Sequence, residues 1–221
     1  MRALDWLLPR RCLVCREAGE DVCEGCSAAL PRIGPTICGR CGKPTQWPVA
    51  RCEECAGRRL AFVSARAAVI YDDAVRAIVS AWKERGLRGI AVLAAELVVD
   101  VVARPAVGAV AWVPADGDRS LERGHHPAER LAQELASRWR LEPLPLVARA
   151  RQTRRQTGMT LVARRRNVAG AFRPLGRSPP RVALVDDVYT SGATATAAAS
   201  ALRAGGARRV EVVTFARAVR G

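Results

Sequence analysis

The chain has 221 residues, enough for one full α/β domain and a small additional module. No stretch reaches the ~20 apolar residues that a membrane span requires, and the first residues lack the pattern of a signal peptide. We therefore expect a soluble cytoplasmic protein without membrane insertion. The formal net charge of +15, from 36 Lys and Arg against 21 Asp and Glu, favours polyanionic partners, nucleic acid first.

Eight cysteines near the start of the chain form four C-x-x-C pairs. One tight turn in such a pair presents two thiolates to a tetrahedral ion, and two turns complete the ligand shell. Disulfides require an oxidising compartment, and the pairs lie in no βαβ pattern typical of redox motifs. The sequence therefore predicts a double zinc-ribbon module over residues 1–60 with two structural Zn2+ ions, held by Cys12, Cys15, Cys23, Cys26, Cys38, Cys41, Cys52 and Cys55.

The pairing of these knuckles is a separate question. We expect neighbouring pairs to share an ion, Cys12/Cys15 with Cys23/Cys26 and the last two pairs with each other, but an interleaved pairing also satisfies the sequence. Four protein ligands close a site in either arrangement. The role of the zinc is therefore expected to be structural or recognitional rather than catalytic.

From residue 61 onward, helical and strand patterns alternate, which is typical of a parallel sheet with helices on both faces. The predicted strands cover residues 64–71, 107–113, 144–147, 182–185 and 210–216. The predicted helices cover residues 73–85 and 90–103, a stretch from about 128 to 140, and one that ends near 202. An Arg-rich polar stretch, residues 149–167, is expected to contain a mobile loop. We divide the chain into a zinc-ribbon module, residues 1–60, and an α/β domain, residues 61–221.

The most informative segment is residues 182–194, where a buried strand ends in two adjacent carboxylates, Asp186 and Asp187. Small and hydroxylated residues follow at once and lead into an Ala-rich helix: Thr190, Ser191, Gly192, Ala193 and Thr194. Backbone N–H groups at a helix start, assisted by hydroxyls, can surround a phosphate, and carboxylates at the end of a strand can accept hydrogen bonds from sugar hydroxyls. The pattern indicates a phosphorylated-sugar site, although Asp187 and Thr190 could also serve only as helix caps.

This segment resembles the 5-phosphoribosyl-1-pyrophosphate (PRPP) motif of type I phosphoribosyltransferases. The resemblance implies a type I phosphoribosyltransferase fold for the α/β domain and binding of PRPP together with Mg2+. It also implies that Asp186 and Asp187 hold the ribose 2′ and 3′ hydroxyls. Residues 190–194 would then cradle the 5-phosphate.

Further residues along the chain resemble the ComF family, zinc-ribbon proteins with a phosphoribosyltransferase domain that are associated with DNA uptake. The resemblance covers about residues 7–217. It rests on the zinc knuckles and the PRPP motif, together with Arg123-Gly124, Arg149, Arg151, Thr153, Gln156, Arg166-Asn167-Val168, Ala171-Phe172 and Ala216-Arg217. One departure is His125-His126-Pro127, where the family commonly has Phe-Asn-Gln after the Arg-Gly pair.

The resemblance also suggests three cationic contacts in the site. Arg123 lies in the expected pyrophosphate loop, and Arg151 lies where the flexible catalytic loop of type I enzymes would close over departing pyrophosphate. Lys83, in the helix predicted at residues 73–85, is a candidate phosphate contact. Each of these side chains could instead be a solvated surface cation.

Three functions remain open at this point. The first is a PRPP-binding protein that handles single-stranded DNA in DNA uptake and natural transformation. The second is an active phosphoribosyltransferase that uses Asp186, Asp187 and Arg151 and releases pyrophosphate to an unidentified acceptor. The third is a zinc-ribbon adaptor that docks a helicase-like partner of DNA uptake.

Overall fold

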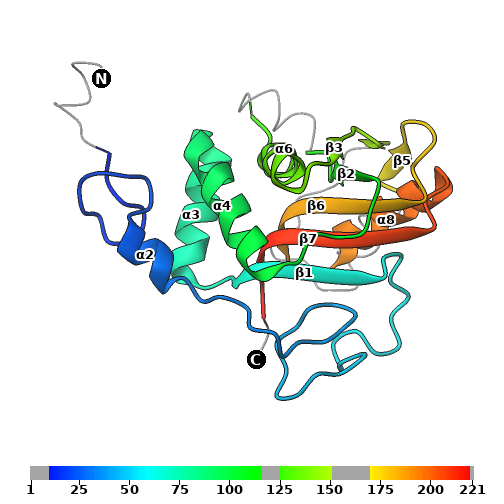
Figure 1. Cartoon of the computed structure of the whole chain (residues 1–221), viewed down its shortest axis with the longest axis horizontal. Coiled ribbons are helices and arrows are strands. Elements are labelled where there is room, and N and C mark those ends of the chain that lie inside the picture. The colour runs from blue at the N-terminus through cyan, green and yellow to red at the C-terminus, as the bar shows by residue number, and fades with distance from the viewer. Residues whose placement is uncertain (1–9, 116–124, 151–169, 220–221) are drawn as a thin grey trace.

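The computed structural model describes residues 10–115, 125–150 and 170–219. Its centre is a five-stranded, fully parallel sheet in the order β1-β7-β6-β2-β3 (Figure 1). The elements in chain order are α2 (Glu24–Ala29), β1 (Ser64–Ile70), α3 (Asp73–Arg85), α4 (Arg88–Val101), β2 (Ala109–Trp112), α6 (Pro127–Trp139), β3 (Glu142–Pro143), β4 (Val147–Arg149), β5 (Phe172–Pro174), β6 (Arg181–Tyr189), α8 (Ala193–Ala204) and β7 (Arg209–Arg217). The expected α/β class, a parallel sheet with flanking helices behind zinc-ribbon sites, is confirmed.

Helix α3 has the bounds that the sequence predicts, because both of its ends carry strong local signals. The Asp72 side chain accepts a hydrogen bond from the Val75 N–H at 2.9 Å and so caps the first turn. At the other end, Gly86 adopts a left-handed conformation with φ +65° and stops the helix. The helix buries one face, with Ile78 and Trp82 packed in the core.

The strand predicted at residues 144–147 is wrong. Pro143 and Pro145 lack the N–H that continuous strand pairing needs, and the segment is divided into β3 on the edge of the main sheet and β4. Strand β4 pairs antiparallel with β5, an element that the sequence did not predict. This small sheet lies beside α8, which contacts both of its strands.

Two apolar cores lie on opposite faces of the main sheet, because successive side chains of a strand point to opposite sides. On β6, Ala183 and Val185 belong to the core that is covered by α3, α4 and α6. Val182 and Leu184 belong to the other core, which is covered by α8. Strands that are buried on both faces explain the continuous apolar run that marks β6 in the sequence.

The two cysteine-rich segments pack into different cores. Leu13, Val22 and Leu30, around the first four cysteines, join the core under α3 and α4. Cys38, Cys41, Cys52 and Cys55 join the core under α8. Figure 1 shows the first segment with α2 beside α3, and the second beyond β1. The division at residue 60 stays a prediction, since it concerns independent folding.

Among the residues that the structure describes, no helix is long and apolar enough to cross a bilayer.

The fit of the second cysteine segment against β1 depends on Gly42. This residue has φ +73°, and a Cβ there would overlap the Ala65 carbonyl oxygen of β1. Gly57 has a similar φ of +68°, but its Cβ would meet nothing within 4 Å. We expect Gly57→Ala to cost about 1–2 kcal/mol from backbone strain alone. Gly42→Ala should cost a further 1–3 kcal/mol or so from the overlap, measured as the free energy of unfolding in urea. Equal costs for the two variants would contradict this packing.

Candidate functional site

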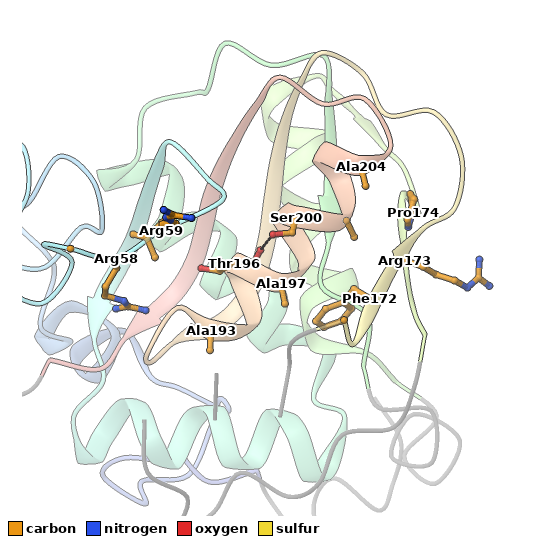
Figure 2. Close-up of a pocket in the computed structure, with 14 residues that line it drawn as sticks. Arg58, Arg59, Phe172, Arg173, Pro174, Ala193, Thr196, Ala197, Ser200 and Ala204 are labelled. Carbon is orange, nitrogen blue, oxygen red and sulfur yellow. Dashed lines mark hydrogen bonds between the residues drawn. The ribbon is translucent and has the colours of Figure 1, made fainter. Parts of the chain in front are cut away.

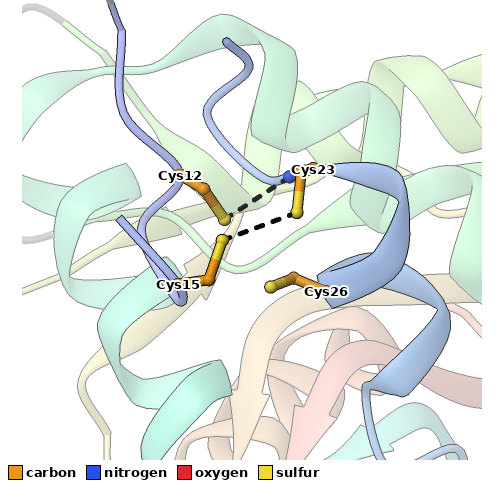
Figure 3. A group of neighbouring side chains, drawn as sticks. All are labelled: Cys12, Cys15, Cys23 and Cys26. Atoms are coloured by element: carbon orange, nitrogen blue, oxygen red, sulfur yellow. Dashed lines mark hydrogen bonds between the residues drawn. The ribbon is translucent and has the colours of Figure 1, made fainter. Parts of the chain in front are cut away.

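The first four cysteines form one site. The Sγ atoms of Cys12, Cys15, Cys23 and Cys26 all lie within 4.8 Å of one another, and Figure 3 shows the four side chains converging. The Sγ atoms of Cys15 and Cys23 are 3.7 Å apart. The neighbouring knuckles therefore share a site, and the interleaved pairing does not occur.

The last four cysteines form an equivalent site. The Sγ–Sγ distance is 3.6 Å between Cys38 and Cys55 and 3.5 Å between Cys41 and Cys52. A tetrahedron with zinc–sulfur bonds of about 2.3 Å has sulfur–sulfur edges of about 3.8 Å. These separations fit a tetrahedral Zn2+ and are too long for disulfides. The expectation of two structural zinc sites is confirmed.

Backbone N–H groups donate hydrogen bonds to one sulfur in each site and so stabilise its thiolate form. The Cys23 N–H donates to Cys12 Sγ at 3.5 Å, and the Cys52 N–H donates to Cys38 Sγ at 3.3 Å. Burial opposes ionisation of both thiols, but these and neighbouring backbone donors outweigh it and lower the pKa of Cys12 and of Cys38 to about 6. One ligand in each site is thus ready to bind metal as a thiolate at neutral pH.

A buried arginine connects the second zinc site to the main sheet. Arg217, at the end of β7, is 1% exposed. Its Nη1 donates to the Cys41 carbonyl oxygen at 2.6 Å, and its Nη2 donates to Glu54 Oε1 at 2.8 Å. The same Nη2 lies 3.7 Å from Cys41 Sγ. The guanidinium is therefore neutralised mainly by the second cysteine segment.

Tyr189 lies between Arg217 and the loop that follows β6. The Arg217 guanidinium stacks 4.5 Å from the centroid of the Tyr189 ring. That ring closes against Gly192, where φ is +69° and any Cβ would overlap the Tyr189 hydroxyl. Burial raises the pKa of Tyr189 to about 12, so the phenol stays neutral. Only glycine fits at position 192.

Arg58 makes a second connection from the same segment. Its Nη2 donates to the Ser191 carbonyl oxygen. The Ser191 hydroxyl in turn accepts from the Ala193 N–H at 3.3 Å, at the start of α8. We call residues 190–194 the hydroxyl loop. Tyr189, which stacks on Arg217, supports this loop on one side, and Arg58 of the second zinc segment supports it on the other.

The two carboxylates stand at the carboxyl end of β6, beside this loop. Asp187 forms an ion pair with Lys83 of α3. Burial would raise the pKa of Asp187, but the Lys83 ammonium outweighs burial and lowers it. Burial and the neighbouring Asp187 charge hold the pKa of Asp186 well above its usual range. The pair therefore comprises one ionised and one readily protonated carboxyl group.

The loop and Asp186 enclose a cavity of only about 10 Å3, which is also lined by Tyr189, Thr190, Gly192 and Thr194, among others. A water molecule is the largest group that a space of this size accepts. A phosphate on the loop must therefore displace side chains or bind at the outer side of its N–H groups.

The structure brings Lys83, Asp186, Asp187 and the hydroxyl loop together, whereas Arg123 and Arg151 lie outside the described residues. No pattern in the sequence indicated the bracing roles of Arg58, Tyr189 and Arg217. Arg217 entered only through the family resemblance, and a lone Arg at the end of an apolar strand was the available signal.

The two histidines that depart from the family pattern are half-buried. His125 Nε2 lies 2.7 Å from the Trp82 carbonyl oxygen, at the end of α3. His126 Nδ1 accepts from the Glu129 N–H at 3.2 Å and caps α6. Both side chains therefore position elements around the site.

The two zinc sites differ in burial, which predicts two rates of metal release. Cys15 is exposed, whereas the four ligands of the second site are at most 8% exposed. We expect a chelator such as pyridylazoresorcinol to remove one equivalent of zinc roughly tenfold faster than the other, because the second site opens only with its core. The measurement is the absorbance of the zinc–chelator complex over time.

Paired variants assign the two phases. Cys15→Ser should eliminate the fast phase alone, and Cys52→Ser the slow phase alone. The reverse assignment, or a single rate for both ions, would overturn the difference in protection.

Known proteins match either the cysteine-rich segment or nearly the whole chain. The double zinc ribbon domain family matches residues 3–56. Competence protein F of Haemophilus influenzae is 29% identical, over 94% of this chain and 97% of that protein. DNA utilization protein YhgH of Salmonella typhimurium is 27% identical, over 93% of this chain and 96% of that protein.

A crystal structure of TT1426 from Thermus thermophilus covers 59% of this chain and 84% of its own, at 18% identity and a TM-score of 0.36. The two sequence relatives and the zinc ribbon match confirm the resemblance of the chain to the ComF family.

Proposed function

We propose that the protein binds PRPP with Mg2+ at the acidic pair and the hydroxyl loop, and that it handles single-stranded DNA in DNA uptake. The observation that carries the proposal is the assembly of Lys83, Asp187 and residues 190–194 at the end of one buried strand. Each group matches one part of a phosphorylated sugar.

The sheet topology supports a ligand at this place. Chain connections run from β6 through α8 to β7 on one side, and from β2 through α6 to β3 on the other. The order therefore reverses between β2 and β6, and ligands of open α/β sheets bind outside the carboxyl ends of strands at such a point. Trp112 at the end of β2 pairs with Val185, one residue before the acidic pair.

The electrostatics suit a ribose that carries phosphate. Ionised Asp187 is an acceptor for ribose hydroxyls and, with Asp186, can approach the Mg2+ of a bound pyrophosphate. Lys83 holds Asp187 ionised and adds a cation next to an anionic ligand. The first N–H groups of α8 have no partner within the helix and point toward the hydroxyl loop, where they favour the 5-phosphate.

The DNA part of the proposal is supported by relatives and by charge. The two sequence relatives are named for competence and for DNA utilization, and they match this chain over nearly its whole length. A net charge of +15 attracts a polyanion in the absence of any base-specific contact.

An active phosphoribosyltransferase is the second candidate. The raised pKa of Asp186 beside an ionised partner favours it, since such a pair suits proton transfer. In that reaction a nucleophile forms a bond to the ribose C1 while the bond to pyrophosphate breaks. The departing pyrophosphate carries away the electron pair, and Arg151 is the proposed cation that stabilises it. A zinc-ribbon adaptor for a helicase-like partner remains the third prediction.

The PRPP site is tested with Asp187→Asn, which removes the charge that Lys83 holds in place. We expect the affinity for PRPP–Mg2+ to fall roughly 10–100-fold, because a hydrogen bond to a charged group contributes about 1.5–3 kcal/mol. Isothermal titration calorimetry measures the affinity. Asp73→Asn is the matched control, since that carboxylate is 91% exposed at the start of the same α3 that carries Lys83.

The control should bind PRPP like the parent protein. If Asp187→Asn also binds PRPP with unchanged affinity, the ribose site has been assigned to the wrong residues.

A further inference from the structure

A groove of about 650 Å3 lies over α8, outside the acidic pair (Figure 2). One face of the helix forms its floor, with Ala193, Ala197, Ala201 and Ala204 at helical spacing. These small side chains, with Thr196 and Ser200 beside them, leave a flat surface that is mostly apolar. The groove extends from the first residue of α8 to its last.

The two walls come from parts of the chain that are far apart in sequence. Residues 57–60, directly after the second zinc site, form one wall, and Phe172 and Pro174 of β5 form the other. Figure 2 shows Arg58 and Arg59 on one side of α8 and Arg173 on the opposite side. Arg59 and Arg173 are exposed, and the Arg173 side chain extends outward from the rim of the groove, where a ligand can reach it.

The charge of the groove has one sign. Three arginines line it, and none of its described lining residues is acidic. Thr196 contributes a buried hydroxyl that has no hydrogen-bond partner among the described residues. An apolar floor, cationic walls and an unsatisfied polar group together specify an anion that carries flat apolar groups.

We propose that this groove binds a segment of single-stranded nucleic acid. The bases lie on the Ala face of α8, and Arg59 and Arg173 contact the backbone phosphates from the two walls. An acidic peptide would satisfy the arginines, but it has no regular flat group to cover the floor. The combination of floor and walls therefore favours nucleic acid.

The groove adjoins the hydroxyl loop. Ala193 begins both the floor and the helix whose first N–H groups face that loop. Arg58 lines the groove and donates to the Ser191 carbonyl oxygen. This inference rests on the proposed function and gives its DNA-handling part a location, with a strand that passes next to the PRPP site.

The test compares two double variants of the full-length, zinc-loaded protein. Arg59→Ala/Arg173→Ala removes the accessible groove cations. Arg88→Ala/Arg130→Ala removes two exposed cations from α4 and α6, on the other face of the sheet. The net charge falls equally in both. Fluorescence anisotropy of a labelled oligothymidylate gives the affinity over a series of salt concentrations.

We expect the groove variant to lose roughly tenfold or more in affinity and to lower the salt slope by about 1.4, the value for two phosphate contacts on a single strand. The control should change less than about twofold. A third variant, Ala197→Glu, places a carboxylate on the floor without removing an arginine and should also weaken binding. Zinc content and PRPP–Mg2+ affinity, measured on every variant, should match the parent protein.

Equal losses in the two double variants, or none in either, would overturn the groove while leaving DNA binding by the protein intact. A parent protein that does not bind the oligonucleotide would overturn the DNA part of the proposed function as well. Stronger competition by polyglutamate than by unlabelled oligonucleotide would assign the groove to an acidic protein partner instead.

Discussion

The fold around the site depends on neutralising one buried cation. Arg217 is almost fully withdrawn from water, and burying a guanidinium without partners is prohibitively costly. Its partners, Glu54 and the Cys41 carbonyl, belong to the second zinc segment. A zinc ion with four thiolates carries a net charge of −2, which adds to this neutralisation. A buried ion pair such as Arg217 with Glu54 adds little net stability, but removing one partner leaves the other charge uncompensated and costs about 3–5 kcal/mol. The pair therefore holds the zinc segment in a defined position.

That position gives the second zinc site a role in the neighbouring loop. The Arg217 guanidinium stacks on Tyr189, the Tyr189 ring closes on Gly192, and Arg58 holds the Ser191 carbonyl. A preorganised loop binds a phosphate without the cost of ordering itself. The first zinc site packs under α3 and α4, on the other face of the sheet, and has no comparable contact with the loop among the described residues. Two metal sites of the same composition therefore stabilise different parts of the molecule.

Sequence reasoning succeeded where a local pattern determines the structure. The C-x-x-C spacing predicted both zinc sites, and the helical spacing of residues 73–85 predicted α3, which Asp72 and Gly86 cap in the structure. It failed at residues 144–147, where prolines interrupt the strand. It could not place the two zinc segments on opposite faces of the sheet, because contacts such as Arg217 with Cys41 join residues 176 positions apart. Lys83 was expected near the site only through the family resemblance, and the structure supplies its partner, Asp187.

The most direct test of this account is amide hydrogen exchange in residues 189–196, measured separately after loss of each zinc site. Cys52→Ser should increase exchange in this segment, since the second site no longer supports Arg217 and Arg58. Cys15→Ser should leave its exchange unchanged while exposing α2 and its surroundings. Exchange in residues 189–196 that is unaffected by Cys52→Ser, or equally affected by both variants, would contradict the central claim that the second zinc site braces the hydroxyl loop.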